Sequence, residues 1–384
     1  MTTFSRRQVL GASAAAVGAA AFGVTALAAS RETGSGTSGS PAGVPEETRS
    51  LDQLYAAAMR EGGALVVYAG GDTAGQQNGT EQAFRSRFPG VGLTTVVDYS
   101  KYHDVRVDSQ IANGAPLPDV VQLQTLHDFP SWKEEGLLLP YKPAGFSALH
   151  DGFKDPDGTW LAIAVTAFSF MYDSRSTGTA APRTPPDLVD ARWKGRIASS
   201  YPQDDDAVLF LYRQYVHEYG WDWAARLATQ NVRFARGTHT PGAAVAAGQK
   251  AIGIGGAAPH PGQAATTRWV AGDDIPFLGW GQRAAILAGA EHPEAAKLYL
   301  NWLLSTEVQH GAANGWSVRT DVPPADGLRP IWEYPNAHVD HFAQFMADRA
   351  EVERWRQTFT LYFGEVQGPP STGWLGMQPG APPT

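Results

Sequence analysis

The sequence has no cysteine among its 384 residues. This absence excludes disulfide bonds, thiolate metal sites, thiol catalysis and lipid attachment through an N-terminal cysteine. An excess of basic residues is also missing, since 30 Lys and Arg residues face 38 Asp and Glu residues for a net charge of −8. The basic residues are scattered along the chain, so it lacks the electrostatic footprint of a nucleic-acid-binding protein, and we expect no nucleic-acid partner.

The common catalytic motifs are missing as well. The sequence contains no Gly-x-Ser-x-Gly elbow, no His-Glu-x-x-His pair and no Gly-Lys-Ser/Thr phosphate loop. We therefore predict a protein that is not an enzyme and that needs no cofactor. An exported, hydrolase-like enzyme whose site is assembled from distant residues is the alternative.

The N-terminus indicates export. Arg6-Arg7 precede an uncharged, Ala/Gly-rich run that extends through Ala29, and Ala26-Leu27-Ala28 is a small-x-small cleavage candidate. Paired arginines before a weakly apolar segment are typical of a twin-arginine signal. An N-terminal anchor helix is the alternative, although the run is hardly apolar enough to span a membrane. We predict a signal peptide at 1–29, the twin-arginine translocase as a partner, and a location in the periplasm or at the cell surface or outside it.

The mature chain begins with a segment of different composition. Residues 30–50 are rich in Gly, Ser, Thr, Pro and Glu, which predicts a flexible linker. From residue 51 onward, short apolar runs alternate with helical patterns. Strands are predicted at 65–68, 93–97 and 119–123, and helices at 51–61, 81–88, 102–112 and 126–135, with one long helix at 340–363 near the C-terminal end. This alternation predicts βαβ units and a mostly parallel sheet.

The chain is longer than a single core usually becomes, which favours two lobes. Residues 160–172 form a long extended apolar run whose length suits a crossing between lobes. A second group of helices and strands follows, and 275–287 reads as a return to the first lobe. We predict lobe 1 at 51–165 and 268–384, and lobe 2 at 166–267.

Several sequence segments, taken in this order, resemble the corresponding segments of one known protein family. They are Leu54 to Gly62 running into Val66-Val67-Tyr68, Pro118-Asp119-Val120-Val121, Ala288 to Lys297, Trp302 to Ser305 with Gln309, and Val318 to Pro324. With them the chain resembles extracellular solute-binding proteins of ABC importers, in the branch that includes ferric-iron-binding proteins. The resemblance implies an α/β, two-lobed periplasmic-binding-protein fold (type II-like) with mostly parallel sheets flanked by helices.

The resemblance also implies a function. The lobes would close on a small molecule or ion, ABC permease and ATPase subunits would be the partners, and we expect a monomer. A secreted ligand scavenger without a transporter is a further alternative. Relatives that bind ferric iron commonly use a pair of adjacent tyrosines after the last strand of the second lobe, where this chain has Ala258-Pro259-His260.

Because Fe³⁺ prefers anionic oxygen ligands, we do not expect iron to be coordinated in that way. An organic or oxyanionic solute, held by backbone amides, tyrosine hydroxyls and aromatic faces, fits better. A different metal site built from Tyr68, Asp72, Tyr99 and Tyr201 stays open.

Candidate ligand-binding residues follow the predicted strands, because ligands of open α/β sheets bind beyond the carboxyl ends of the strands. Gly70 and Gly71 would let backbone amides approach a ligand. Asp72 is either a ligand contact or the cap of the helix that follows it. Tyr68 and Tyr201 are predicted to face each other across the cleft. The predicted set is Tyr68, Gly70, Gly71, Asp72, Tyr99, Gln124, Thr125, Phe168, Ser169, Ser200, Tyr201, Asp204, His260 and Trp280.

Overall fold

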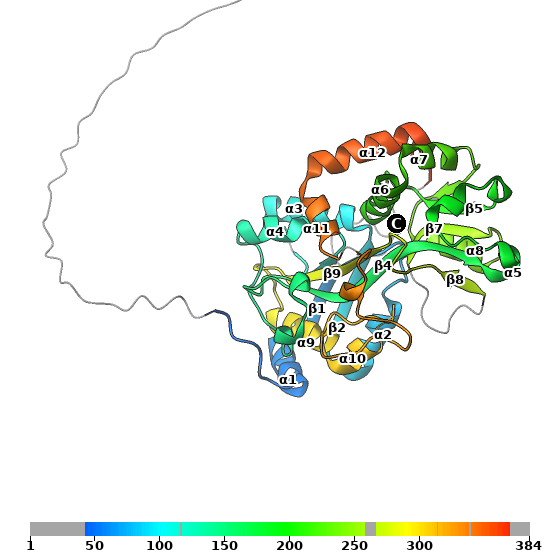
Figure 1. Ribbon diagram of the computed structural model, residues 1–384. Helices are drawn as coiled ribbons and strands as arrows, with labels where there is room; N and C mark the ends of the chain where they lie inside the picture. Colours follow the sequence, from blue (N-terminus) through cyan, green and yellow to red (C-terminus); the bar gives the residue numbers. More distant parts are fainter. Residues whose placement is uncertain (1–42, 116, 258–265, 313, 338, 369–384) are drawn as a thin grey trace, which may run out of the picture. The chain divides into compact units, whose positions relative to one another are not determined.

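The computed structural model describes residues 43–368 except 116, 258–265, 313 and 338 (Figure 1). The predicted signal peptide, most of the predicted linker and His260 lie outside the described residues. In the part of the chain that is described, no helix has the length and apolar character that a membrane span requires.

The strands form one sheet in which two parallel groups flank a pair of long antiparallel strands. The order is β2-β1-β3-β9-β4-β7-β5-β6, and β8 pairs with β4. β1 pairs in parallel with β2 and β3, and β5 pairs in parallel with β6 and β7. The bounds are β1 Ala64–Gly70, β2 Gly92–Asp98, β3 Val120–Leu123, β4 Leu161–Asp173, β5 Ile197–Ser200, β6 Arg233–Ala235, β7 Ile252–Ala257, β8 Thr267–Trp269 and β9 Leu278–Ile286.

The crossing strands explain the two-lobed α/β architecture. β4 has 13 residues; its first half pairs antiparallel with β9, its second half pairs with β7 and β8, and β9 in turn pairs with β3. One apolar run therefore passes from the first parallel group to the second, as the run at 160–172 predicted. The predicted α/β fold with flanking helices is confirmed.

The helices cover the sheet at the places that the sequence pattern indicated (Figure 1). α1 begins at a capping box, in which the Ser50 hydroxyl accepts from Gln53 N and the Gln53 side chain accepts from Ser50 N. The bounds are α1 Leu51–Glu61, α2 Asn78–Arg87, α3 Ser100–Asn113, α4 Asp128–Glu134, α5 Ser174–Thr177, α6 Asp206–Tyr219, α7 Trp221–Ala228, α8 His239–Ala246, α9 Pro293–Leu303, α10 Thr306–His310, α11 His341–Ala347 and α12 Arg349–Phe363.

The C-terminal helix differs from its prediction. The pattern indicated one helix from Asp340 to Phe363, but the chain breaks at Asp348, whose backbone has φ −89° and ψ 82°. The Asp348 side chain accepts a hydrogen bond from Glu351 N at 2.8 Å, so it caps α12. A capping residue in mid-pattern thus divides one amphipathic stretch into α11 and α12.

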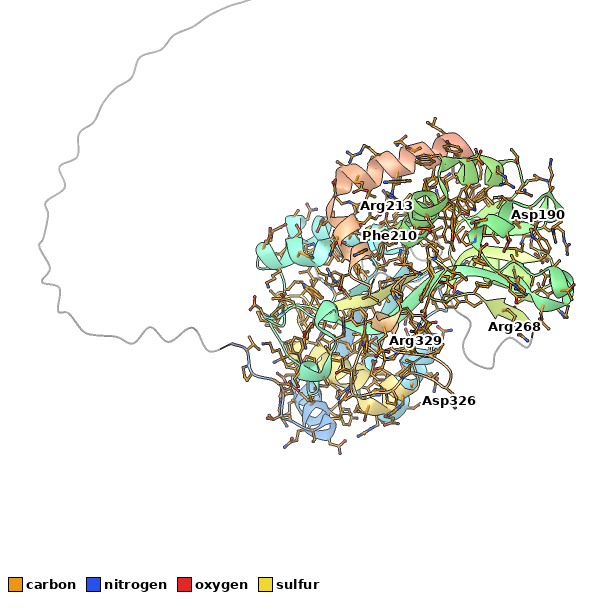
Figure 2. The ribbon with its side chains drawn as sticks, in the orientation of Figure 1. Asp190, Phe210, Arg213, Arg268, Asp326 and Arg329 are labelled. Carbon is orange, nitrogen blue, oxygen red and sulfur yellow. The ribbon has the colours of Figure 1, made fainter. Side chains whose placement is uncertain are left out.

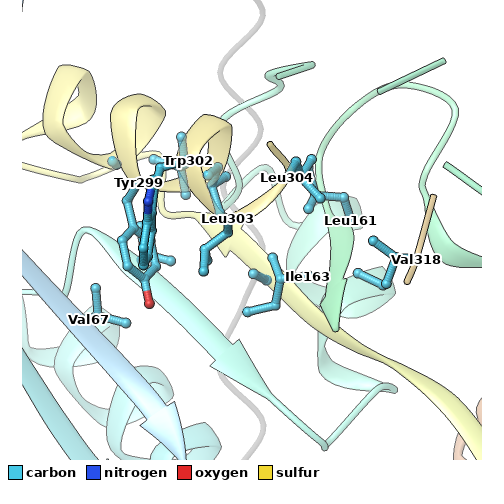
Figure 3. Close-up of a cluster of buried hydrophobic side chains, with 14 of the residues drawn as sticks. Val67, Leu161, Ile163, Tyr299, Trp302, Leu303, Leu304 and Val318 are labelled. Carbon is cyan, nitrogen blue, oxygen red and sulfur yellow. The ribbon is translucent and has the colours of Figure 1, made fainter. Parts of the chain in front are cut away.

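Hydrophobic side chains gather in two large clusters and one small one. The first large cluster joins β1, β4 and α9, and Figure 3 shows Val67, Ile163 and Tyr299 within it. The second surrounds α6 and includes β4, β7, α11 and α12. In it, Phe210, which is labelled in Figure 2, packs against Phe345 with the ring centroids 5.4 Å apart. The small third cluster covers β1 and β3 on the side of α3 and α4.

The boundaries of the two lobes stay a prediction. The packing of the C-terminal helices and the contacts of the predicted linker bear on them. α11 and α12 belong to the same hydrophobic cluster as α6 and α7, which the sequence assigns to lobe 2. Within the predicted linker, the Glu46 carboxylate accepts from Gly145 N at 2.6 Å, and Arg49 forms an ion pair with Glu294 at 2.6 Å. The last residues before α1 are therefore held against the folded body.

Candidate ligand-binding cavity

A cavity of about 520 Å³ lies between the two parallel groups of strands. Its wall is formed by the ends of β1 and β3, the starts of α3, α6 and α8, the crossing strands β4 and β9, and the helices α9 and α10. Nine of the fourteen predicted residues line it: Gly70, Gly71, Asp72, Tyr99, Gln124, Thr125, Phe168, Asp204 and Trp280.

The prediction that Tyr68 binds the ligand is corrected by its position in the structure. It is fully buried in the third hydrophobic cluster and does not line the cavity. Its hydroxyl accepts a hydrogen bond from Gln110 Nε2 at 2.9 Å, and its ring lies 4.9 Å from that of His103. Successive residues of a strand point to opposite faces of the sheet, and Tyr68 points toward α3. The terminal position of Tyr68 in its apolar run did not reveal this.

The predictions that Ser169, Ser200 and Tyr201 contact the ligand are also corrected, because these residues are buried beside the cavity rather than in its wall. Ser200 donates its hydroxyl hydrogen to the Gly237 carbonyl at 3.0 Å. The Tyr201 ring stacks on Phe234 at 5.3 Å, so Tyr201 and Tyr68 do not face each other. Ser169 on β4 is fully buried. The Ser200 hydroxyl thus serves a local hydrogen bond, and the Tyr201 ring serves packing.

The Gly-Gly turn needs glycine because of the protein around it. A Cβ at Gly70 would lie 2.2 Å from Ser100 Oγ, and one at Gly71 would lie 2.6 Å from Val97 Cγ1. The amide of Gly71 donates to the Asp98 carbonyl at 2.9 Å, which extends the pairing of β1 with β2. Both glycines border the cavity, but the Gly71 amide is engaged in the sheet.

Asp72 caps a helix, although not the one that follows it. Asp72 Oδ2 accepts hydrogen bonds from the backbone N–H groups of Thr238 at 2.7 Å and His239 at 3.2 Å, and also from the Thr238 hydroxyl. These groups stand at the first turn of α8, in the other half of the sheet. A carboxylate at a helix N-terminus is stabilised by the unpaired amides and the helix dipole. Asp72 therefore joins the two walls of the cavity.

Two further polar contacts cross the cavity in the same way. Lys101 Nζ, at the start of α3, donates to the backbone oxygen and to Oδ1 of Asp204, each at 2.6 Å. Gln124 Nε2, after β3, donates to Asp205 Oδ2 at 3.2 Å. Asp205 Oδ1 accepts from the Ala207 and Val208 amides and so caps α6. The Asp204-Asp205-Asp206 run combines a helix start with contacts across the cavity.

The lining is acidic. Four carboxylates line the cavity, from Asp72, Asp204, Asp205 and Asp206, against one lysine, Lys101, among the described residues. Burial and the neighbouring Asp72 carboxylate raise the pKa of Asp205 to about 7. Burial, with Asp72 and Asp204 adding to it, raises the pKa of the Tyr99 hydroxyl, so Tyr99 stays neutral and keeps its proton for hydrogen bonding.

Aromatic and amide side chains complete the wall. The Trp280 and Phe168 rings meet edge to face at 4.9 Å. Tyr299 on α9 donates its hydroxyl hydrogen to Gln122 Oε1 at 2.9 Å. The sequence reasoning missed Tyr299, Lys101 and Thr238, which line the cavity. Lys101 lies two residues after the predicted residue Tyr99, so including more residues after the second strand would have found it. No sequence pattern indicates that Tyr299, on α9, lines this cavity.

Comparison with known proteins supports the resemblance. The family model described as bacterial extracellular solute-binding protein matches residues 115–256. No curated protein sequence matches the chain. Among solved structures, the substrate-binding protein of an ABC transporter from Agrobacterium tumefaciens has a TM-score of 0.64 at 16% identity, over 78% of this chain and 94% of its own.

Two other structures show the same fold. The periplasmic binding protein AfuA from Actinobacillus pleuropneumoniae, solved with fructose-6-phosphate, has a TM-score of 0.63 at 20% identity, over 79% of this chain and 99% of its own. Iron-bound HitA from Pseudomonas aeruginosa has a TM-score of 0.59 at 16% identity, over 77% and 99%. The family model therefore supports the resemblance to extracellular solute-binding proteins, and the solved structures, iron-bound HitA among them, share the fold of this chain.

Proposed function

We propose that this protein is an exported solute receptor of an ABC-type importer and that it holds one small solute in the described cavity. The observation that carries the proposal is the cavity itself: both parallel groups of strands line it, and Asp72, Lys101 and Gln124 make polar contacts across it. Breaking such contacts and forming them again is how a two-lobed protein opens and closes around a ligand. The predicted signal peptide accounts for the export.

The solute is an uncharged or cationic organic molecule with hydroxyl or amine groups. Among the described residues that line the cavity, Asp204 and Asp206 pair with Lys101 and Arg356, which leaves the Asp72 and Asp205 carboxyls and no unpaired basic side chain in the lining for an anion. Burying a charge requires a partner of opposite sign, so a phosphate ester would be disfavoured here. Trp280, Phe168 and Tyr99 offer apolar faces for carbon–hydrogen surfaces, while Gln122 and Thr125 offer hydrogen bonds. This narrows the predicted organic or oxyanionic solute to the organic class.

The test is a thermal-shift screen of the purified chain against sugars and polyols, amines, amino acids, phosphate esters, inorganic oxyanions and ferric citrate. A true ligand at one hundred times its Kd should add about 2.7 kcal/mol of stability. We expect hits among polyols or amines, followed by one-to-one binding in calorimetry. Stabilisation by phosphate esters alone would overturn the proposed solute class, and the absence of any hit would remove support for the receptor. Uptake by vesicles that contain the cognate permease and ATPase would test transport.

A further inference from the structure

Three side chains that can bind a metal converge outside the cavity. Asp104 lies on α3, and His127 and Asp128 lie at the start of α4. Each offers one ligand atom, and these atoms all lie within 4.8 Å of one another. One ion can therefore reach all three with small side-chain movements, because its bonds to nitrogen and oxygen ligands are about 2.0–2.2 Å long.

Two polar atoms of this cluster have no hydrogen-bond partner among the described residues. His127 Nδ1 and Asp128 Oδ2 are buried and form no hydrogen bond, while His127 Nε2 lies 3.3 Å from Asp128 Oδ1. Buried polar atoms are normally paired, so each unpaired one calls for an explanation such as an ion. The side chains of His127 and Asp128 are 19% and 13% exposed, which leaves a path from solvent.

The surrounding charges do not already neutralise the cluster. Arg349 donates to the Met346 carbonyl at 3.3 Å, Arg356 pairs with Asp206, and Arg283 donates to the Leu126 carbonyl. Asp108, the other acid nearby, accepts a hydrogen bond from Trp132 Nε1 at 2.8 Å. Among the described residues, no lysine or arginine forms an ion pair with Asp104 or Asp128, whose negative charges thus have only the more distant arginines to offset them.

We propose that Asp104, His127 and Asp128 form a binding site for one divalent transition-metal ion such as Zn²⁺ or Mn²⁺. One imidazole nitrogen and two carboxylate oxygens are ligands that such ions accept, and water would complete the coordination. The ion would fasten the start of α4 to α3. None of the three side chains lines the cavity, so the site is separate from the one that holds the solute and does not depend on the proposed transport function.

The experiment is a titration of the tag-free full chain, stripped with a chelator, with ZnCl₂ and separately with MnCl₂ in a calorimeter. We expect one equivalent of one of these ions to bind at pH 8. Asp104→Asn and His127→Gln should each weaken binding by about tenfold or more, since even residues that only support metal ligands cost about 10–100-fold. The matched substitutions His217→Gln and Asp222→Asn, on exposed residues of α6 and α7, should leave affinity unchanged.

Two results would overturn the site. One is no binding of either ion at pH 8, and the other is binding that neither triad substitution weakens. Circular dichroism and melting curves would show whether each variant is folded. If the variants do not fold, crystals of the unaltered protein soaked in ZnCl₂ decide the question: an anomalous peak between the three side chains supports the site, and its absence there rejects it.

Discussion

The Asp72 carboxylate accepts a hydrogen bond from the backbone N–H of Thr238 at 2.7 Å, although 166 residues separate the two in the chain. One end of this contact follows β1, and the other begins α8. A residue at the edge of the first parallel group thus caps a helix of the second. A single side chain thus joins the two walls of the cavity.

Replacing Asp72 with alanine should weaken both closure and solute binding. Loss of an N-cap typically costs about 0.5–2 kcal/mol, and the same loss in the closed state would lower solute affinity by roughly 2- to 30-fold. Calorimetry with the solute found by screening measures this. Asp52→Ala, at an exposed acid on α1, is the control and should leave affinity unchanged. Equal affinities of the two variants would show that the contact does not couple to binding.

The Lys101–Asp204 pair should contribute a measurable coupling free energy. Its side chains are 29% and 11% exposed, and the lysine also bonds to the Asp204 carbonyl, so the pair is more restrained than a surface ion pair. We expect a coupling of about 1 kcal/mol. A double-mutant cycle of Lys101→Met and Asp204→Asn, followed by urea unfolding, gives the value. Additive effects would mean that the two side chains act independently.

Asp205 should make stability fall as pH rises. Its pKa is raised to about 7 in the folded protein, against an ordinary value of 3.8, so between these values the folded state binds more protons than the unfolded state. The free energy of unfolding therefore decreases with pH in this window, by up to about 1.4 kcal/mol per pH unit from this group, and levels off above pH 7.

Asp205→Asn isolates this effect from the other carboxyls. Asparagine can still cap α6 and has no titrating proton, so the variant should lack the Asp205 part of the slope. Denaturant unfolding of both proteins from pH 4.5 to 8 measures the difference. Parallel curves for the two proteins would contradict the raised pKa.

Tyr68→Phe should lower stability without changing solute affinity. The substitution removes the hydroxyl that accepts from Gln110, at a cost of about 1 kcal/mol. Tyr299→Phe is the matched variant, because Tyr299 lines the cavity and its hydroxyl orients Gln122. We expect this variant to change solute affinity. Weaker binding in Tyr68→Phe with unchanged binding in Tyr299→Phe would reverse the assignment of the two tyrosines.

Local patterns predicted the secondary structure well, because local chemistry sets it. The capping residue Ser50 precedes α1, and the apolar runs of β1, β2 and β3 alternate with helices where the sequence indicated them. The predicted helix boundaries differ from the structure where one residue has two possible roles. Asp348 reads as one more polar position on a helix, yet it caps α12.

The candidate site was predicted only as far as strand ends reveal it. Gly70, Asp72, Tyr99 and Gln124 follow strands and line the cavity, because parallel strands bring their carboxyl ends to one edge. Tyr201 also follows a strand, and Tyr68 lies inside β1 near its end, but both are buried elsewhere. The direction in which a side chain near a strand end points depends on the twist of the sheet and on which helix covers that face of the sheet. Neither can be inferred from the sequence of the strand alone.

By itself the sequence determined the alternating α/β elements, the long crossing strand and the Gly-Gly-Asp turn at the end of β1, since propensity, periodicity and capping act over a few residues. Only the tertiary structure decided which partners these residues have. The cap formed by Asp72 on α8 and the Lys101–Asp204 contact join segments far apart in the chain. Such contacts arise when the sheet brings its two halves together, and no local pattern encodes them.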